Sequence, residues 1–444
     1  MIKRRYQVVY TLLRPVFRLF TRLSYHYTAL PAPKLRKGQA AMILANHNGA
    51  MDPFFMALSF RRPIFFVASD HIFRLGIVSA VIRFLVAPIP IVKSQLDLRA
   101  LRQIREIIQS GGLIGLFPEG NRSFSGQTMH IPPSTGKLIK QLKCTLILYR
   151  LDGGYLTTPR WALYRRKGFM QGQVVRCIEP DELASLSAEE VYQLICEALQ
   201  VDPFEQQRRL QIPYRGRRLA ETLELTLFVC PRCHSLATLS SADDRFHCTC
   251  GLAVRYTELG FFEPLDSWSV QQRSDGLFLD NIAVWDQWQR KILPELLFDN
   301  QALDATGHKP LFVDRGQKLV LTERAARSQV MATGSLLLYA DRLAFIADEG
   351  KADPKADHEN NEKIGQADEG KAGQVNEDKA DYSFHVASIS RIIVHGQLTL
   401  QFTTRDDVVW EIRSQTRRSA YKYVLVFHLL QQQLKGEPYG FLSI

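Results

Sequence analysis

One short segment limits how this chain can fold. Residues 45–53 read ANHNGAMDP, and they lie at the end of an apolar run that begins at residue 40. A short apolar run that ends in an Asn-Gly turn predicts a buried strand. Asp52 followed by Pro53 predicts a helix over residues 53–60, with the aspartate as its N-cap. We therefore expect His47 at the end of the strand and Asp52 at the start of the helix, both at the mouth of a cleft.

His47 and Asp52 have the chemistry of a general base and its orienting carboxylate. Histidine titrates near neutral pH, so it can accept the proton of an alcohol. A carboxylate bonded to the far ring nitrogen fixes the tautomer and stabilises the imidazolium that forms. The structural alternative is that Asp52 only caps the helix and His47 is an ordinary loop residue, although capping and catalysis are compatible for Asp52.

A second segment has features of a phosphate-binding loop. Residues 111–117, GGLIGLF, predict a turn and a buried strand, which Pro118 ends. The following loop would lie at the carboxyl end of the strand, where open α/β sheets bind ligands. Arg122 offers a fork of donors suited to a phosphate, and Gly120 lets the backbone approach it closely. The alternative is an exposed loop with a surface arginine.

Together these segments resemble the glycerolphosphate acyltransferase superfamily, and within it the 1-acyl-glycerol-3-phosphate acyltransferases. That family shows His-x4-Asp and then Phe-Pro-Glu-Gly-Thr-Arg-Ser, and this chain differs only in having Asn121 for Thr. The resemblance covers about residues 35–150. It implies an α/β acyltransferase domain, a mixed sheet flanked by helices, which we expect over residues 31–222 with His47 and Asp52 as its catalytic residues.

The resemblance also implies a set of residues that bind the acyl acceptor. Lys93 falls where the family carries an arginine, and lysine binds phosphate as a point charge without the bidentate fork. This departure leaves the identity of the acceptor open. The expected substrate-binding residues are Asn46, Lys93, Glu119, Gly120, Arg122 and Ser123.

The resemblance implies an O-acyltransferase of phospholipid synthesis. It would move a fatty acyl chain from a thioester, either acyl-CoA or acyl carrier protein, to the hydroxyl of a lysophosphatidate-like acceptor. A second interpretation keeps this chemistry with glycerol-3-phosphate or another lysophospholipid as acceptor. A third is a non-catalytic zinc-containing membrane scaffold or nucleic-acid binder, but we do not expect nucleic acid as a partner.

The net charge of +11 is concentrated in the first half of the chain, where basic side chains are about twice as numerous as acidic ones. Such a surface favours an anionic partner. Residues 1–30 predict a basic amphipathic helix lying in a membrane interface. Its apolar side chains at helical spacing are Tyr6, Val9, Tyr10, Leu13, Val16, Phe17 and Phe20, with Lys3, Arg14, Arg18 and Arg22 on the other side.

Arginines interrupt this segment too often for a transmembrane helix, and it has no signal-peptide core. The alternative is a helix packed on its own domain. We expect the protein at the cytoplasmic face of a membrane, as a peripheral or monotopic protein whose partners are the phospholipid surface, a lysophospholipid and an acyl thioester.

Two cysteine pairs predict a structural Zn²⁺ site within a zinc-ribbon-like module at residues 226–262. Cys230 and Cys233 form a Cys-x2-Cys turn, and Cys248 and Cys250 follow on a second turn. The second pair is one residue short of Cys-x2-Cys, so His247 is an alternative ligand to Cys248. Four protein ligands leave no open position for chemistry. Redox-active or idle thiols are the other interpretation.

The last third of the chain predicts strands over residues 310–347 and 382–412, followed by one helix over 419–434. Antiparallel strands closed by one helix resemble the pleckstrin-homology-like barrel, and we expect a mostly β barrel-like module over 270–436. Residues 348–381 interrupt it. This insertion has almost no large apolar side chains, so we expect it to be disordered.

Overall fold

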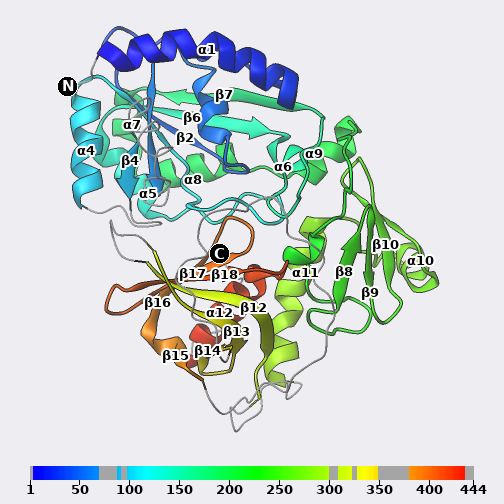
Figure 1. The fold of residues 1–444 in the computed structure, drawn as a ribbon. Helices are drawn as coiled ribbons and strands as arrows, with labels where there is room; N and C mark the ends of the chain where they lie inside the picture. Colours follow the sequence, from blue (N-terminus) through cyan, green and yellow to red (C-terminus); the bar gives the residue numbers. More distant parts are fainter. Residues whose placement is uncertain are drawn as a thin grey trace. The chain divides into compact units, whose positions relative to one another are not determined.

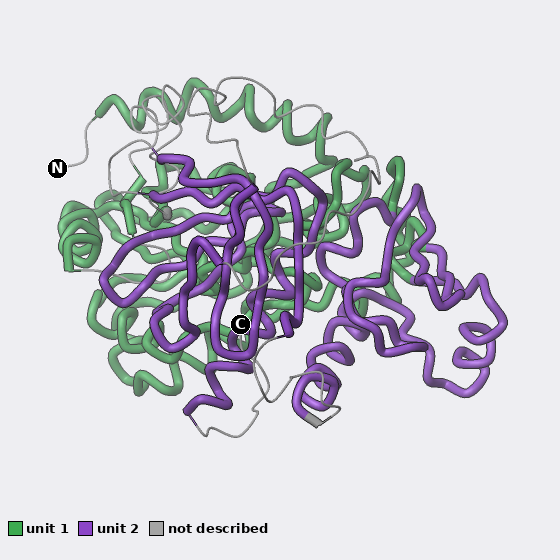
Figure 2. The backbone as a smooth tube through the Cα atoms, turned by 60° about the horizontal axis from the view of Figure 1, so that its bottom comes forward, with its two compact units in different colours: residues 1–219, 256–261 green, residues 220–255, 262–444 purple. Residues whose placement is uncertain are grey.

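The computed structural model describes residues 4–69, 88–91, 98–299, 309–322, 328–348 and 380–435 (Figure 1). The chain divides into two compact units, residues 1–219 with 256–261 and residues 220–255 with 262–444 (Figure 2). Lys93 and nearly all of the insertion expected at 348–381 lie outside the described residues. The domain limits inferred from the sequence remain predictions.

Unit 1 is built on a mixed seven-stranded sheet, as expected, in the order β1-β7-β6-β2-β5-β3-β4. The pairings are parallel except that of β6 with β7. The strands are β1 (Tyr27–Ala29), β2 (Ala41–Ala45), β3 (Ile64–Ser69), β4 (Ile89–Ile91), β5 (Leu113–Leu116), β6 (Thr145–Asp152) and β7 (Met170–Ile178). The helices are α1 (Arg4–Tyr25), α2 (Asp52–Ala57), α4 (Leu98–Gln109), α5 (Ser134–Leu142), α6 (Gly154–Thr157), α7 (Pro180–Ser185), α8 (Ala188–Leu199) and α9 (Pro203–Leu210).

Strand β2 is buried on both faces, which explains its uninterrupted apolar sequence. Met42 and Leu44 pack in a core cluster with side chains of α4, α5 and α8. Ile43 and its neighbours pack on the other face with side chains of α2. Because β2 and β5 are parallel neighbours, the segments that follow them begin at the same edge of the sheet. His47 and Glu119 lie in these two segments.

Helix α1 is oriented differently from the sequence-based expectation. Arg14 and Arg18, expected on the side opposite Tyr10, donate hydrogen bonds to the carbonyl of Leu58 at 3.0 and 2.9 Å, and the Tyr10 hydroxyl donates to the nearby carbonyl of Phe60 at 3.0 Å. Carbonyls at the end of a helix such as α2 lack intrahelical donors, so they attract these side chains. The exposed large apolar side chains of α1 are Val8, Leu12, Leu13, Val16, Leu19, Phe20 and Leu23. Within the described part of the chain, no helix is long and apolar enough to cross a membrane.

Unit 2 begins with a small four-stranded sheet in the order β11-β10-β9-β8. Its strands are β8 (Leu239–Ala242), β9 (Arg245–Cys248), β10 (Ala253–Tyr256) and β11 (Phe262–Pro264), followed by α10 (Ser267–Ser274) and α11 (Ile282–Pro294). Trp285 of α11 is the centre of this module. Its ring packs edge-on against Phe246 and Phe262, and its indole N–H donates to the carbonyl of Val229 at 3.0 Å.

The rest of unit 2 is a curled antiparallel sheet of seven strands, in the order β15-β14-β13-β12-β18-β17-β16. The strands are β12 (Phe312–Thr322), β13 (Gln329–Leu338), β14 (Arg342–Ala347), β15 (Tyr382–His385), β16 (Ile389–His395), β17 (Thr399–Thr404) and β18 (Val409–Ser414). Phe384 of β15 contacts Trp410 of β18, so the sheet curls strongly. Among the described residues β15 and β16 are its edges, so the mostly β barrel-like module expected from the sequence is a half-barrel.

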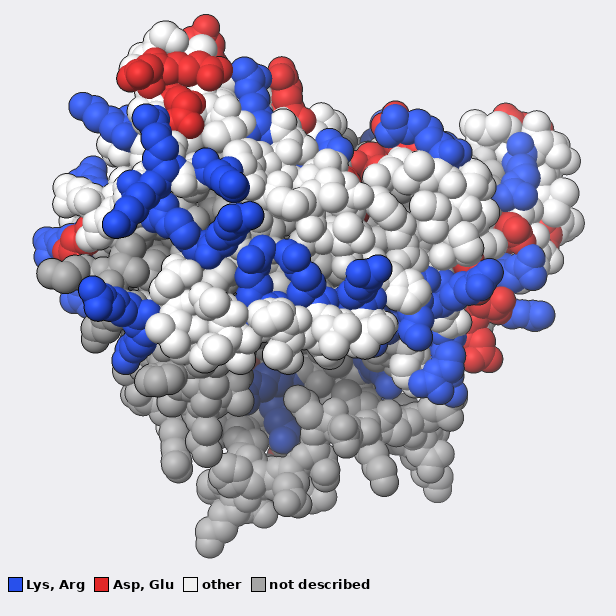
Figure 3. Space-filling model, turned by 90° about the horizontal axis from the view of Figure 1, so that it is seen from above, with Lys and Arg blue, Asp and Glu red and all other residues white. Residues whose placement is uncertain are grey.

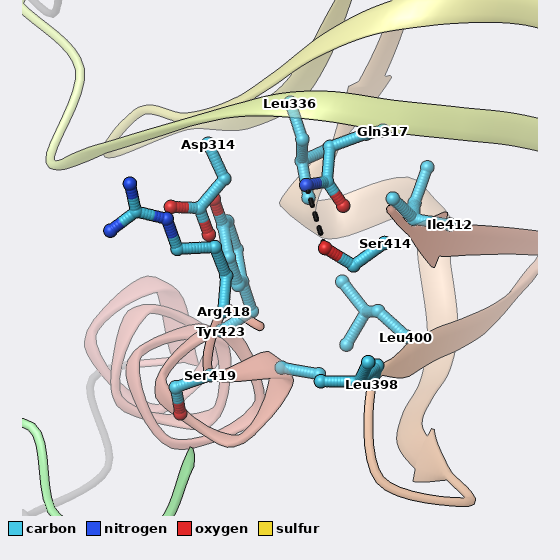
Figure 4. Close-up of a pocket in the computed structure, with 11 residues that line it drawn as sticks. Asp314, Gln317, Leu336, Leu398, Leu400, Ile412, Ser414, Arg418, Ser419 and Tyr423 are labelled. Atoms are coloured by element: carbon cyan, nitrogen blue, oxygen red, sulfur yellow. Dashed lines mark hydrogen bonds between the residues drawn. The ribbon is translucent and has the colours of Figure 1, made fainter. Parts of the chain in front are cut away.

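The single helix expected at the end of the module is α12 (Ala420–Lys435), and it is buried on nearly all sides. Beside its first turn is a small pocket that opens to solvent (Figure 4). Of its polar lining side chains, Gln317 donates to Ser414 at 2.9 Å. Asp314 accepts from Lys422, a buried residue of α12 outside the lining, at 2.9 Å. The candidate catalytic residues belong to unit 1 and do not line this pocket.

Candidate functional site

The structure brings His47 and Asp52 together at the end of β2. The Nδ1 atom of His47 lies 2.9 Å from Oδ2 of Asp52, whose side chain is 1% exposed. Because the carboxylate is an acceptor, it selects the tautomer with the proton on Nδ1. The other ring nitrogen, Nε2, is then the basic one. The His47 side chain is 21% exposed, so a substrate can reach it.

Asp52 does not cap α2 as the sequence suggested. Its Oδ2 accepts the backbone N–H groups of Asn48 and Gly49 at 2.7 and 2.8 Å, and the N-cap residue Met51 makes no side-chain capping bond. The carboxylate therefore points back into the turn that carries His47. This arrangement fixes the histidine ring and its carboxylate within a single local turn.

Glu119, expected to bind the acceptor, instead bonds to the backbone of the turn that carries His47. Its Oε1 accepts the backbone N–H of His47 at 2.6 Å, and its Oε2 accepts the backbone N–H of Met129 at 2.7 Å. The side chain is buried. Burial raises the pKa of Glu119 to about 8, the two backbone hydrogen bonds lower it, and the Asp52 carboxylate raises it further. Glu119 thus joins the loop after β5 to the backbone of His47.

The raised pKa of Glu119 predicts a pH-dependent stability. A carboxyl group whose pKa is higher in the folded than in the unfolded chain contributes stability that is complete below the unfolded pKa of about 4.3 and is lost as the pH rises through about 8. The free energy of unfolding should fall over this range, by at most about 1.4 kcal/mol per pH unit for this one group. Urea unfolding of the native chain and of Glu119→Gln should show a flatter profile for the variant.

Glu205→Gln, which removes an exposed carboxyl group in α9, is the control and should keep the native profile. Parallel profiles for the native chain and Glu119→Gln would show that Glu119 ionises like an ordinary surface carboxyl group.

The other residues of the expected phosphate loop lie next to Glu119. Gly120 has a φ of 67°, a left-handed conformation that favours glycine. Burial lowers the pKa of the Arg122 guanidinium, and the nearby Asp52 carboxylate acts in the opposite direction. The backbone N–H of Ser123, the residue after Arg122, donates to the carbonyl of His47 at 3.2 Å, so the loop that carries Arg122 lies against the turn that carries His47 and Asp52. Arg122 brings a positive charge to it.

Two of the expected substrate-binding residues bond to the protein itself. The side-chain amide of Asn46 donates to the carbonyl of Leu151 at 3.0 Å and accepts its N–H at 2.8 Å, which joins the end of β2 to β6. The Ser123 hydroxyl donates to the carbonyl of Gln127 at 2.6 Å and accepts the N–H of Gly126 at 2.8 Å. Both side chains are 1% exposed. In this conformation they hold the site loops in place.

Sequence reasoning missed the segment after β6, which contributes Thr158 and Arg160. A Cβ atom added to Gly49 would lie 3.3 Å from both Oδ1 of Asp52 and Oγ1 of Thr158, so Thr158 lies against the turn that carries His47 and Asp52. Among the described residues Oδ1 of Asp52 has no hydrogen-bond partner. The buried Arg160 bonds to the loop that carries Arg122. No sequence pattern distinguishes these two residues from other loop residues.

The four cysteines form a separate candidate metal centre in unit 2. The sulfur atoms of Cys230, Cys233, Cys248 and Cys250 all lie within 4.8 Å of one another. The Cys230–Cys250 sulfur distance is 3.6 Å and the Cys233–Cys248 distance is 3.8 Å. Tetrahedral Zn²⁺ with bonds of about 2.3 Å separates its sulfur ligands by about 3.8 Å, so the arrangement fits this ion.

His247 is not part of the cysteine cluster. Its side chain is exposed and its Nε2 lies 3.0 Å from the hydroxyl of Ser240. The ligand set that the structure offers is therefore four thiolates, although the second turn is one residue shorter than Cys-x2-Cys. Gly251, with a φ of 93°, allows the chain to turn sharply directly after Cys250.

The comparisons with known proteins concern unit 1. Residues 30–148 match the family model described as Acyltransferase, and this range contains both site segments. One similar solved structure is the 1-acyl-sn-glycerophosphate (LPA) acyltransferase PlsC from Thermotoga maritima, which is 19% identical over 45% of this chain and 82% of that chain, with a TM-score of 0.37. No curated protein matches the sequence. The family match confirms the resemblance drawn from the two motifs.

Proposed function

We propose that this chain, in which residues 30–148 match the Acyltransferase family model, transfers a fatty acyl group from a thioester to the hydroxyl of a lysophosphatidate-like acceptor. The observation that carries the proposal is the His47–Asp52 contact of 2.9 Å, with the loop of Arg122 bonded to the carbonyl of His47 through the Ser123 N–H at 3.2 Å. The donor is acyl-CoA or acyl carrier protein. The family match covers residues 30–148 alone, so the choice of acceptor rests on the cation Arg122 and on the resemblance of the motifs.

In the proposed mechanism, Nε2 of His47 accepts the proton as the acceptor hydroxyl attacks the thioester carbonyl. Asp52 stabilises the imidazolium through Nδ1. The tetrahedral intermediate then expels the thiolate, which takes the proton from His47 and leaves as a thiol. Arg122, with Lys93 as a second cation, pairs with the phosphate of the acceptor and places its hydroxyl near the base. No metal takes part in these steps.

An acceptor panel tests this proposal. Long-chain acyl-CoA is incubated with lysophosphatidate, glycerol-3-phosphate or an uncharged monoacylglycerol, and product is measured for each. Lysophosphatidate should be the best acceptor, because only it combines the phosphate with an acyl chain. A preference for glycerol-3-phosphate would favour the second interpretation, in which the acceptor is not lysophosphatidate. Equal turnover of the uncharged monoacylglycerol would show that Arg122 does not bind an acceptor phosphate.

The exposed face of α1 supports a second proposal, that this helix binds a phospholipid surface containing anionic lipids. Val8, Leu12, Val16, Leu19 and Leu23 recur at helical spacing and are 56–67% exposed. The helix contains several arginines and no acidic residue. Figure 3 shows this side of the protein, where Lys and Arg side chains gather around uncharged surface. An apolar strip bordered by cations matches the acyl boundary and headgroups of an anionic bilayer.

Placing negative charges in the apolar strip should abolish this binding. We expect Leu12→Glu with Leu19→Glu to lower the vesicle-bound fraction at least about tenfold, because each leucine loses its burial in lipid. Co-sedimentation with phosphatidylglycerol-containing vesicles measures the effect. Gln7→Glu adds a negative charge to an exposed polar position of the same helix and should bind nearly as well as the native chain. Unchanged binding of the double variant would exclude α1 as the contact.

A further inference from the structure

The segment that follows β6 packs against the loop that carries Arg122. Tyr155 and Trp161 are each 1% exposed. The Trp161 indole N–H donates to the Tyr155 hydroxyl at 3.1 Å, and this hydroxyl donates to the carbonyl of Phe124 at 3.0 Å. A rigid aromatic pair therefore places residues 158–160 next to the loop.

Arg160 of this segment forms hydrogen bonds to the loop that carries Arg122. Its side chain is 3% exposed, and the guanidinium lies 4.0 Å from the centre of the Phe124 ring. One guanidinium nitrogen donates to the backbone carbonyl of Arg122 and to Oδ1 of Asn121, both at 3.0 Å. A buried guanidinium is strongly constrained, so these contacts fix the backbone of the loop.

Asn121 completes the contact, and it is also the position at which this chain departs from the family pattern. Its Oδ1 accepts both the backbone N–H of Arg122 at 3.0 Å and the Arg160 guanidinium. The threonine of the family pattern has a shorter side chain whose single hydroxyl lies closer to the backbone, so it cannot reach both donors in this geometry. The asparagine and the buried arginine therefore function together.

We infer that Arg160 and Asn121 form a clamp that positions the Arg122 loop and thereby sets the affinity for the acceptor phosphate. Both are positioning residues, since they act through the backbone of Arg122. The effect on acceptor affinity rests on the proposed function. The positioning of the Arg122 loop involves only contacts within unit 1, so it can be tested without measuring acyl transfer.

Hydrogen–deuterium exchange tests the clamp directly. In Arg160→Met the peptide covering residues 119–126 should exchange at least about tenfold faster, because a charge-assisted bond to the loop is lost. The amides of Ser123 and Gly126 report this, since they donate to His47 and to the Ser123 hydroxyl in the native chain. Arg209→Met, at an exposed position of α9, is the control. Unchanged exchange in Arg160→Met would overturn the inference.

Asn121→Thr provides a milder second variant, which carries the test if Arg160→Met does not fold. It should also raise the exchange rate of the peptide covering residues 119–126. In the double variant the rate should rise by less than the two single increases combined, because both substitutions remove the same hydrogen bond between Arg160 and Asn121. Additive effects would show that the two residues act separately and would overturn the clamp.

Kinetics then separate the clamp from the proposed function. If the native chain transfers acyl groups to lysophosphatidate, Arg160→Met should raise the acceptor KM about tenfold, with kcat and the donor KM little changed, and Arg160→Lys should restore part of the loss. A faster-exchanging loop with an unchanged acceptor KM would overturn the role in affinity. If the loop exchanges faster in Arg160→Met but the native chain transfers no acyl group, the proposed function is refuted. The positioning of the loop by Arg160 and Asn121 is then still supported.

Discussion

Replacing His47 by alanine should lower kcat for acyl transfer by about 10²- to 10⁴-fold, the range that a positioned general base contributes. The imidazole is the basic group at the end of β2, and it is held at 2.9 Å by the Asp52 carboxylate. Because the ring also stacks on Phe117 and bonds to the buried Asp52, its loss should lower the free energy of unfolding by about 1–3 kcal/mol and leave the chain folded. Initial rates with long-chain acyl-CoA and lysophosphatidate, together with a denaturation curve for each protein, measure both effects.

Asp52→Asn provides a second test of the same contact. The amide keeps the size of the carboxylate, and its oxygen can still accept the Nδ1–H bond, but it carries no charge and so leaves the imidazolium that forms uncompensated. We expect a large loss in kcat with a smaller effect on either KM. His385→Ala, which removes an exposed histidine of unit 2, is the matched control and should be fully active. Substantial turnover by His47→Ala would reject the proposed mechanism whatever the acceptor.

Removing metal from the cysteine cluster should unfold the small β module of unit 2. Apparent binding energies of structural Zn²⁺ in small domains are about 10–16 kcal/mol, so the folding of such a module depends on the ion. We expect about one zinc per chain in protein purified under reducing conditions, measured by elemental analysis. A strong chelator should remove it and accelerate hydrogen exchange in β8 and β9.

Single substitutions identify the ligands. Cys230→Ser should abolish stoichiometric zinc, because this buried thiolate is one of the four sulfurs within 4.8 Å of one another. His247→Ala should keep the zinc, since its ring bonds to Ser240 outside the cluster. Cys196→Ser, a cysteine of α8, is the control. If the protein contains no zinc and the chelator does not change its melting temperature, the metal site is rejected and the four cysteines are free thiols.

The sequence determined the local parts of both centres. His47 and Asp52 meet because a short turn joins a strand end to a helix start, and such a turn is encoded in consecutive residues. The two cysteine turns are local in the same way, and the resemblance carried by the two local motifs implied the mixed sheet. These features need no knowledge of which elements pack together.

The tertiary structure decided the features that depend on contacts between distant segments. Glu119 appeared in sequence as a residue of the acceptor loop, but the parallel pairing of β2 with β5 directs its carboxylate to the backbone of His47. Arg160 had no sequence signal at all, since a buried arginine is recognised only from what covers it. The orientation of α1 likewise depends on the carbonyls at the end of α2 that attract Arg14 and Arg18.

Features read from the sequence and features decided by the tertiary structure differ in which part of the chain constrains them. Turn geometry and metal-ligand spacing arise from the covalent chain over a few residues, so the sequence alone determined the chemical groups of each site. The direction in which a side chain points is set by hydrogen-bond partners and packing surfaces supplied by other segments. The sequence by itself therefore determined which base, carboxylate, cation and thiolates this protein carries, whereas only the tertiary structure decided which of them face a substrate and which hold the site together.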